Sequence, residues 1–262
     1  MTTTITIANQ KGGVGKTTTA VTLAYGLVRK GCRVLLVDLD PQGQCATILG
    51  LKPESGAFNL LVAEQPLSQV MRSTDRPNLF VILGDRKTAV AQTVLNVQRS
   101  PISFTHAKLV PAAQKEAIDY VVIDTSPSVG ELQEQALWAA NGVLIPCAVD
   151  YLASDGVFNI AVTLKRIKEE FDWQGRIVGI LPTFYDSVTR ESQATIQDLK
   201  KRFPKLILSS IHRATVLREC AVEGKTIFEM SPGSRAAAQY EELVGFVLEW
   251  QKRNQDSRSP AK

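Results

Sequence analysis

A stretch rich in lysine, glycine and threonine could bind phosphate near the start of the chain. It reads Lys11-Gly12-Gly13-Val14-Gly15-Lys16-Thr17-Thr18. Glycines let backbone N–H groups approach phosphate oxygens, and the start of a helix adds partial positive charge. Lys16 can then reach the β- and γ-phosphates of a nucleotide, and the Thr17 hydroxyl can ligate Mg²⁺. The stretch therefore predicts a phosphate-binding loop made of all eight residues.

Lys11 is the unusual member of this loop. The common pattern G-x-x-x-x-G-K-[ST] would place its first glycine at position 10, where Gln10 stands, and Lys11 lies inside the loop instead. One interpretation is a solvated surface lysine. The other is an extra cation for the triphosphate, comparable to an arginine finger. A cation beside an anion site favours the second interpretation.

Carboxylates follow two apolar runs farther along the chain. Asp38 and Asp40 end the run that begins at Arg33, and Asp124 ends the run that begins at Asp119. Parallel strands present their carboxyl ends at the edge where α/β sheets bind ligands. Asp38 is therefore predicted to hold Mg²⁺ through water, and Asp124 directly or through water, together with Thr17. The alternatives are a turn beginning at Asp40 and a helix cap at Asp124.

The elements that must position these residues alternate between strand and helix patterns. Strands are expected at 4–7, 33–38, 78–84, 119–124, 142–147, 176–182 and 206–211, and helices at 20–27, 88–95, 131–140, 157–171, 189–203 and 235–252. This alternation predicts an α/β fold with a doubly wound, mostly parallel β-sheet flanked by helices. We expect one domain over residues 1–252 and a polar, disordered tail over 253–262.

Composition is ordinary for a globular protein. The chain has 262 residues, 44% hydrophobic and 21% charged, with a net charge of +4. No apolar run reaches the roughly 18 residues of a membrane span, and the first residues lack the basic region of a signal peptide, so we expect a cytoplasmic protein. The scattered cysteines predict reduced thiols, not a disulfide framework or a zinc site; they are Cys32, Cys45, Cys147 and Cys220.

The phosphate loop resembles the deviant Walker A box of the ParA/MinD group of P-loop ATPases. The runs ending at Asp38-Leu39-Asp40-Pro41 and at Asp124 resemble the second and third motifs of that group. The resemblance implies ATP and Mg²⁺ as cofactors. It also implies that Lys11, Lys16 and Asp40 are catalytic. Lys11 would cross a dimer interface to the partner's nucleotide, Lys16 would act within its own chain, and Asp40 would orient or deprotonate the attacking water.

The same resemblance implies a ParA-type partitioning function. The chain would form a homodimer in ATP and bind duplex DNA without sequence preference. A cargo-bound ParB-like or adaptor protein would stimulate hydrolysis and release the DNA. The cargo would be a plasmid, a chromosome or a protein assembly, and the ATP form would associate with the nucleoid. Arg190 and Arg218 are the candidate DNA contacts, with a solvated helix face as the alternative interpretation.

Other functions remain open or are disfavoured by particular residues. A dinucleotide-binding fingerprint would leave Lys16 without a role and has Thr18 in place of its third glycine. A MinD-like membrane role is disfavoured because no large apolar residue follows Trp250. A cytoplasmic ATPase that positions something without DNA, and a metabolic P-loop enzyme, remain as alternatives. His212-Arg213 stands where the group usually has Pro-Arg in the loop over the adenine, which weakens any adenine contact at position 212.

Overall fold

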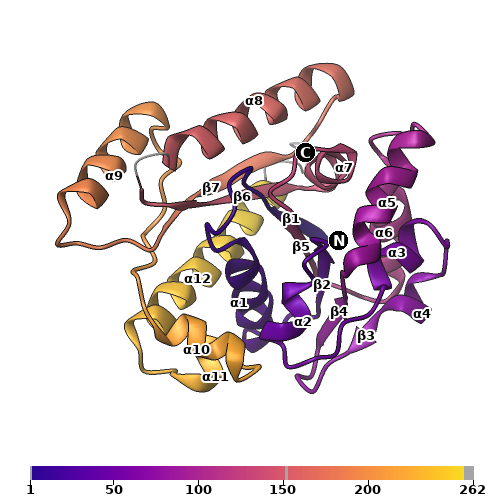
Figure 1. Cartoon of the computed structure of the whole chain (residues 1–262), viewed down its shortest axis with the longest axis horizontal. Coiled ribbons are helices and arrows are strands. Elements are labelled where there is room, and N and C mark those ends of the chain that lie inside the picture. Colours follow the sequence, from indigo (N-terminus) through magenta and orange to yellow (C-terminus); the bar gives the residue numbers. More distant parts are fainter. Residues whose placement is uncertain (1, 151–152, 257–262) are drawn as a thin grey trace.

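A twisted, mostly parallel sheet forms the centre of the molecule (Figure 1). The computed structural model describes residues 2–150 and 153–256. Within these ranges the seven strands lie in the order β3-β4-β2-β5-β1-β6-β7. They are β1 (Thr3–Ile7), β2 (Val34–Leu39), β3 (Arg72–Ser73), β4 (Leu79–Ile82), β5 (Tyr120–Thr125), β6 (Gly142–Ala148) and β7 (Arg176–Thr183). Only the β3–β4 pair among them is antiparallel.

Helices cover both faces of this sheet. One face carries α1 (Lys16–Arg29), α2 (Gln44–Ile48), α10 (Val216–Val222), α11 (Ile227–Met230) and α12 (Arg235–Asp256). The opposite face carries α3 (Gly56–Leu61), α4 (Leu67–Val70), α5 (Arg86–Val97), α6 (Phe104–Lys115), α7 (Glu131–Ala139), α8 (Ala153–Phe171) and α9 (Arg190–Arg202). This arrangement confirms the predicted doubly wound fold.

The apolar runs of the central strands fit this double cover. In β2, Val34 and Leu36 pack into the core under α1 and α12, whereas Leu35 and Val37 pack into the core on the other face. Successive side chains of a strand point to opposite faces. A strand buried on both faces therefore needs a continuous apolar run, which is what the sequence shows. Among the described residues, no helix combines the length and the apolar character needed to cross a bilayer.

The segment predicted as a last strand at 206–211 is an interrupted one. It makes only isolated parallel bridges, Ile180 with Ile207 and Tyr185 with His212. The N–H of Leu208 donates to Ile180, but the next bond to β7 comes from Ile211, whose N–H donates to the carbonyl of Pro182. Because Pro182 has no N–H, it cannot donate back to this segment, and the ladder loses its register there.

Two other predicted boundaries differ from the structure. The last helix was expected to end at Lys252, and α12 continues to Asp256. Residues 257–262 of the predicted tail lie outside the described residues, so the domain limit at 252 stays a prediction. The mixed-polarity region 85–111 contains α5 and the start of α6. Helix α6 includes Pro111, which hid its period in the sequence.

Arg76 joins two parts of the helical layer next to the sheet. It is 5% exposed. Its Nε and Nη2 donate to the Glu229 carboxylate over 2.9 and 3.1 Å. It also donates to the carbonyls of Leu49, at the end of α2, and Gly224, after α10. Burial would raise the pKa of Glu229, but the hydrogen bonds from Arg76 and Thr226 lower it overall.

We expect Arg76→Ala to lower the free energy of unfolding by about 3 kcal/mol, because it strands a partly buried carboxylate and two carbonyls. Urea denaturation would measure this loss. Arg72→Ala is the matched control, since Arg72 forms an ion pair with the exposed Glu54. We expect this control to cost less than about 1 kcal/mol. Equal effects of the two substitutions would contradict the structural role of Arg76.

Candidate functional site

The predicted phosphate loop joins β1 to α1 at the carboxyl end of the sheet. Gly13 and Gly15 have φ angles of 71° and 83°, and Gly15 is the N-cap of α1. Residues with a side chain rarely adopt this left-handed backbone conformation, so the backbone path requires glycine at both positions. A Cβ at Gly12 or Gly13 would have nothing within 4 Å, so the loop borders open space that a ligand can enter.

Contacts with β6, β7 and α8 hold the loop in place. Asn9 accepts a hydrogen bond from the N–H of Lys11 over 2.9 Å and donates to the carbonyl of Pro146 over 2.7 Å. The Thr183 hydroxyl donates to the carbonyl of Val14 over 2.9 Å. A Cβ at Gly156 on α8 would lie 2.2 Å from the Asn9 amide oxygen, so only glycine fits there. The path of the loop is thus fixed by hydrogen bonds within the chain and by close packing against α8.

Lys16 and Thr17 begin α1 beneath the loop. Lys16 is 6% exposed, and its Nζ donates to the carbonyl of Lys11 over 3.0 Å. Burial lowers the pKa of Lys16, and the nearby Asp124 and Asp40 partly offset this by raising it. The ammonium therefore lies inside the loop with carboxylates on one side. An entering phosphate would meet this cation and the backbone N–H groups of the loop.

Asp38 and Asp124 lie side by side on adjacent strands. They are register partners in the β2–β5 pair, and both are fully buried. Asp38 accepts backbone hydrogen bonds from Asp40 and Cys45 over 2.9 and 3.2 Å. Burial nevertheless raises the pKa of Asp38 to about 7. Burial and then the neighbouring Asp38 charge raise the pKa of Asp124, while a hydrogen bond from Thr17 lowers it.

These groups fit a divalent cation such as Mg²⁺. The Thr17 hydroxyl and the two carboxylates offer only oxygen, the ligand type that Mg²⁺ prefers. The Oδ1 atom of Asp124 is buried and has no hydrogen-bond partner among the described residues. A bound cation would satisfy that oxygen and relieve the repulsion between the two carboxylates. The structure thus brings Thr17, Asp38 and Asp124 together as the sequence predicted.

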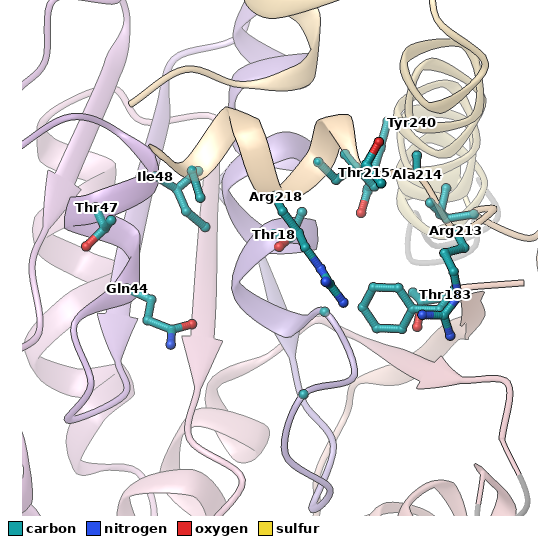
Figure 2. A pocket seen from close by; sticks show the side chains of 16 residues that line it. Thr18, Gln44, Thr47, Ile48, Thr183, Arg213, Ala214, Thr215, Arg218 and Tyr240 are labelled. Carbon is teal, nitrogen blue, oxygen red and sulfur yellow. The ribbon is translucent and has the colours of Figure 1, made fainter. Parts of the chain in front are cut away.

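Two adjoining cavities open beside the loop. The smaller, of about 320 Å³, is lined by the loop glycines, Lys16, Thr17, Asp40 and Pro127. The larger, of about 580 Å³, is lined by residues of α1, α2, α10 and α12 and by the segment after β7 (Figure 2). Gly13, Gly15, Thr18, Gln44 and Phe184 line both. The first suits phosphates, and the second has the size and mixed polarity for a base and a sugar.

The two candidate DNA contacts lie in different surroundings. Arg190 is the exposed first residue of α9. Arg218 points from α10 across the larger cavity (Figure 2). Arg218 is therefore placed to contact a ligand in that cavity, which its helical spacing could not show. Neither DNA contact is tested by the structure, and both stay predictions.

Lys11 does not point into the phosphate cavity of its own chain. Its Nζ donates to both carboxylate oxygens of Asp150, over 2.5 and 2.7 Å. The side chains of Lys11 and Asp150 are 31% and 47% exposed. The ammonium is thus held beyond the end of β6, at the protein surface. No motif marks Asp150, so the sequence could not identify this partner.

Several cavity residues were missed or only partly read in the sequence. Cys45 lies between the two buried carboxylates, and Phe184 lines both cavities. Arg213 lines the larger cavity, but His212 does not. The His212 ring packs edge-on against Tyr185, and its Nδ1 lies 2.6 Å from the amide nitrogen of Gln239. These contacts hold the His212 ring outside the residues that line the larger cavity, and the prediction of a weak base contact at position 212 stays a prediction.

Comparison with known proteins identifies relatives over nearly the whole chain. The family model for an AAA domain (AAA_31) matches residues 2–176. The chromosome-partitioning ATPase Soj of Thermus thermophilus is 37% identical over 245 residues, covering 93% of this chain and 94% of that protein. These matches include the phosphate loop and the strands that carry Asp38 and Asp124.

Solved structures share the fold. The apo structure of McdA from Cyanothece superposes with a TM-score of 0.86 at 25% identity, covering 95% of this chain and all of that chain. Cobyrinic acid a,c-diamide synthase from Mycobacterium smegmatis, with bound ATP analogue and magnesium, gives 0.82 at 28% identity and 97% coverage of both chains.

We expect Lys16→Ala to weaken Mg·ATP binding about 10- to 100-fold, the worth of one hydrogen bond to a charged group. Titration with a fluorescent ATP analogue would measure the affinity. Lys30→Ala is the control, because Lys30 follows the other end of α1 and pairs with Glu241 on the surface. Unchanged affinity in the Lys16 variant would show that this lysine does not contact the phosphates.

Proposed function

The chain belongs to the Soj/ParA family of P-loop ATPases, and from this premise we propose that it positions a cargo through an ATP-dependent homodimer on DNA. It is an ATP hydrolase that uses Mg²⁺ as its cofactor. The observation that carries the proposal is a phosphate loop with two lysines above a pair of buried carboxylates. Lys16 serves the chain's own nucleotide, and Lys11 is kept at the surface.

Within one site the residues divide the work. Lys16 and the backbone of the loop bind and orient the β- and γ-phosphates, while Thr17, Asp38 and Asp124 would hold Mg²⁺. The cation neutralises charge on the phosphates. Asp40 lines the phosphate cavity and accepts a hydrogen bond from the N–H of Gln42 over 2.9 Å. From this position we propose that Asp40 orients the attacking water and takes its proton.

The site becomes complete only in the dimer. A second chain facing the phosphate loop would present its Lys11 to the γ-phosphate, where the charge grows during hydrolysis. ATP would therefore favour the dimer, and loss of the γ-phosphate would release it. A partner protein of ParB-like or adaptor type, bound to the cargo, would stimulate this step. The working location is the cytoplasm, with nucleoid association in the ATP state.

DNA binding would use exposed basic side chains of α9. Arg190 is exposed there, and Lys200 and Lys201 are exposed at the other end of the same helix. Contacts from such side chains to phosphates are independent of sequence and depend steeply on salt. The proposal therefore predicts a protein that covers any duplex in ATP and leaves it after hydrolysis. Cargo identity would then come from the partner.

A second candidate is synthesis of a small molecule with ATP. The observation that favours it is the 28% identity and shared fold with cobyrinic acid a,c-diamide synthase. The 37% identity to Soj favours positioning instead. ATP-dependent dimerisation without any small substrate would decide for the positioning function.

We expect Lys11→Ala to bind nucleotide like the wild type but to remain monomeric with a non-hydrolysable ATP analogue. The reason is that the Lys11 side chain is bound to Asp150 and does not line the phosphate cavity of its own chain, whereas it would contact the γ-phosphate of the partner's nucleotide. Sedimentation velocity in the analogue, in ADP and without nucleotide would test this. Lys165→Ala, at an exposed lysine of α8, is the control and should dimerise. A dimer of the Lys11 variant as stable as the wild type would remove the cross-subunit role.

We expect the protein to bind random-sequence duplex DNA in ATP, but not in ADP or without nucleotide. Salt should weaken the binding in ATP. Fluorescence anisotropy at several salt concentrations would measure it. Arg190→Ala should weaken binding for every sequence and lower the salt slope by about 1. Arg202→Ala is the control on the same helix, because Arg202 pairs with Asp198. Absence of binding in every nucleotide state would exclude the DNA-based form of the proposal.

A further inference from the structure

A thiol lies between the two carboxylates of the cation site. Cys45 is fully buried near the start of α2. Its Sγ is 3.7 Å from Oδ2 of Asp124, and its N–H donates to Oδ2 of Asp38 over 3.2 Å. One ligand atom from each of Asp38, Cys45 and Asp124 lies within 4.8 Å of the other two. Residues far apart in the sequence thus form a compact two-oxygen, one-sulfur group.

The spacing suits a tetrahedral cation. Zinc bonds sulfur at about 2.3 Å and carboxylate oxygen at about 2.0 Å, which separates the sulfur and oxygen ligands by about 3.5 Å around a tetrahedral ion. The observed distance of 3.7 Å between Sγ of Cys45 and the Asp124 oxygen is close to this value. Small side-chain shifts would bring the third ligand atom into the same shell.

A second observation concerns one oxygen of the Asp124 carboxylate, which has no hydrogen-bond partner among the described residues. Oδ1 of Asp124 is buried without a hydrogen bond among the described residues, although Asp124 is fully buried. Such an oxygen is costly unless a cation or a donor satisfies it. Mg²⁺ would satisfy the oxygen but has little preference for sulfur, whereas Zn²⁺, Co²⁺ and similar ions accept both.

We propose that Asp38, Cys45 and Asp124 bind a borderline-soft divalent cation of the Zn²⁺ class when the nucleotide is absent. The fourth position would be filled by water or the Thr17 hydroxyl. Binding breaks the S–H bond of Cys45, forms a metal–sulfur bond and releases the proton to solvent, with no change of oxidation state. This binding competes with Mg·ATP because the two cations need the same carboxylates.

Charge and access support this site. Two carboxylates and one thiolate carry three negative charges, which the divalent ion and the neighbouring Lys16 ammonium together neutralise. The phosphate cavity of about 320 Å³ adjoins the group, because Thr17, which forms a hydrogen bond with Asp124, lines it. The spacing of the cysteines could not indicate this site, because only Cys45 belongs to it and a single cysteine forms no zinc-binding motif. The inference does not depend on DNA binding or dimerisation.

The competing explanation is that Cys45 fills space as a small apolar residue. It belongs to the core cluster that includes Ala46 and Leu49. Buried cysteines commonly behave in this way. A packing role and a metal-binding role differ in one observable, the bond between the sulfur and a metal.

Cobalt(II) tests that bond directly in the nucleotide-free protein. We expect one Co²⁺ per chain with a near-ultraviolet thiolate-to-cobalt charge-transfer band. The band should be absent in Cys45→Ala and present in Cys32→Ser. Cys32 lies just before the amino end of β2, whereas the cation site lies at the carboxyl end of that strand. Equilibrium dialysis should show Zn²⁺ binding at least about 10-fold weaker in Cys45→Ala, since removal of a ligand costs no less than loss of an outer-shell partner. Adding Mg·ATP should remove the wild-type band.

Each result decides the proposal. A wild-type protein that takes up Co²⁺ without the charge-transfer band, or takes up none, overturns it. A band that persists in Cys45→Ala overturns it as well. Circular dichroism would confirm that the variant is folded, and Cys45→Ser replaces it if alanine unfolds the protein. Failure here would leave ATP binding and DNA binding untouched, so it is distinguishable from failure of the proposed function.

Discussion

The arrangement of the site depends on two carboxylates buried side by side. Asp38 and Asp124 are register partners on β2 and β5, with no exposed surface. Burial raises the pKa of both carboxyls. The charge of Asp38 raises the pKa of Asp124 further, and the ammonium of Lys16 lowers it in part. The surroundings of the two carboxyls therefore disfavour their charged form. A nucleotide that arrives with a divalent cation removes this penalty, so binding of the cation and binding of the phosphates support each other.

Different contacts hold the phosphate loop and the wall of the larger cavity. The phosphate loop is held by Asn9 and by the Thr183 hydroxyl, both anchored in the sheet region. The wall of the larger cavity comes instead from short helices, α2 and α10, which Arg76 and Glu229 connect. The free energy of that buried ion pair thus helps to set the shape of the cavity, although neither residue lines it.

Sequence reasoning predicted what is local in the chain. The glycine–lysine loop, and the acids at the ends of apolar runs, follow from periodicity and from the chemistry of strand ends. It could not predict contacts between distant segments, such as Cys45 with Asp124 or Lys11 with Asp150, because nothing in the spacing marks them. The direction of Arg218 depends on the rotation of α10, and the broken strand at 206–211 depends on the one N–H that Pro182 lacks. These features are consequences of tertiary packing, about which a single amino-acid sequence gives little information.

The contact of Lys11 with Asp150 bears on how the proposed dimer could form. Both side chains are substantially exposed. An ion pair of this kind contributes at most about 1 kcal/mol. A charge-assisted contact to a phosphate, shielded from water between two chains, is worth about 1.5–3 kcal/mol. The contact of Lys11 with the partner's nucleotide would therefore be more favourable than its contact with Asp150, and the fold would not need to rearrange. When the γ-phosphate leaves, Lys11 would again form its ion pair with Asp150 of the same chain. This change of one side-chain contact would couple hydrolysis to release of the partner.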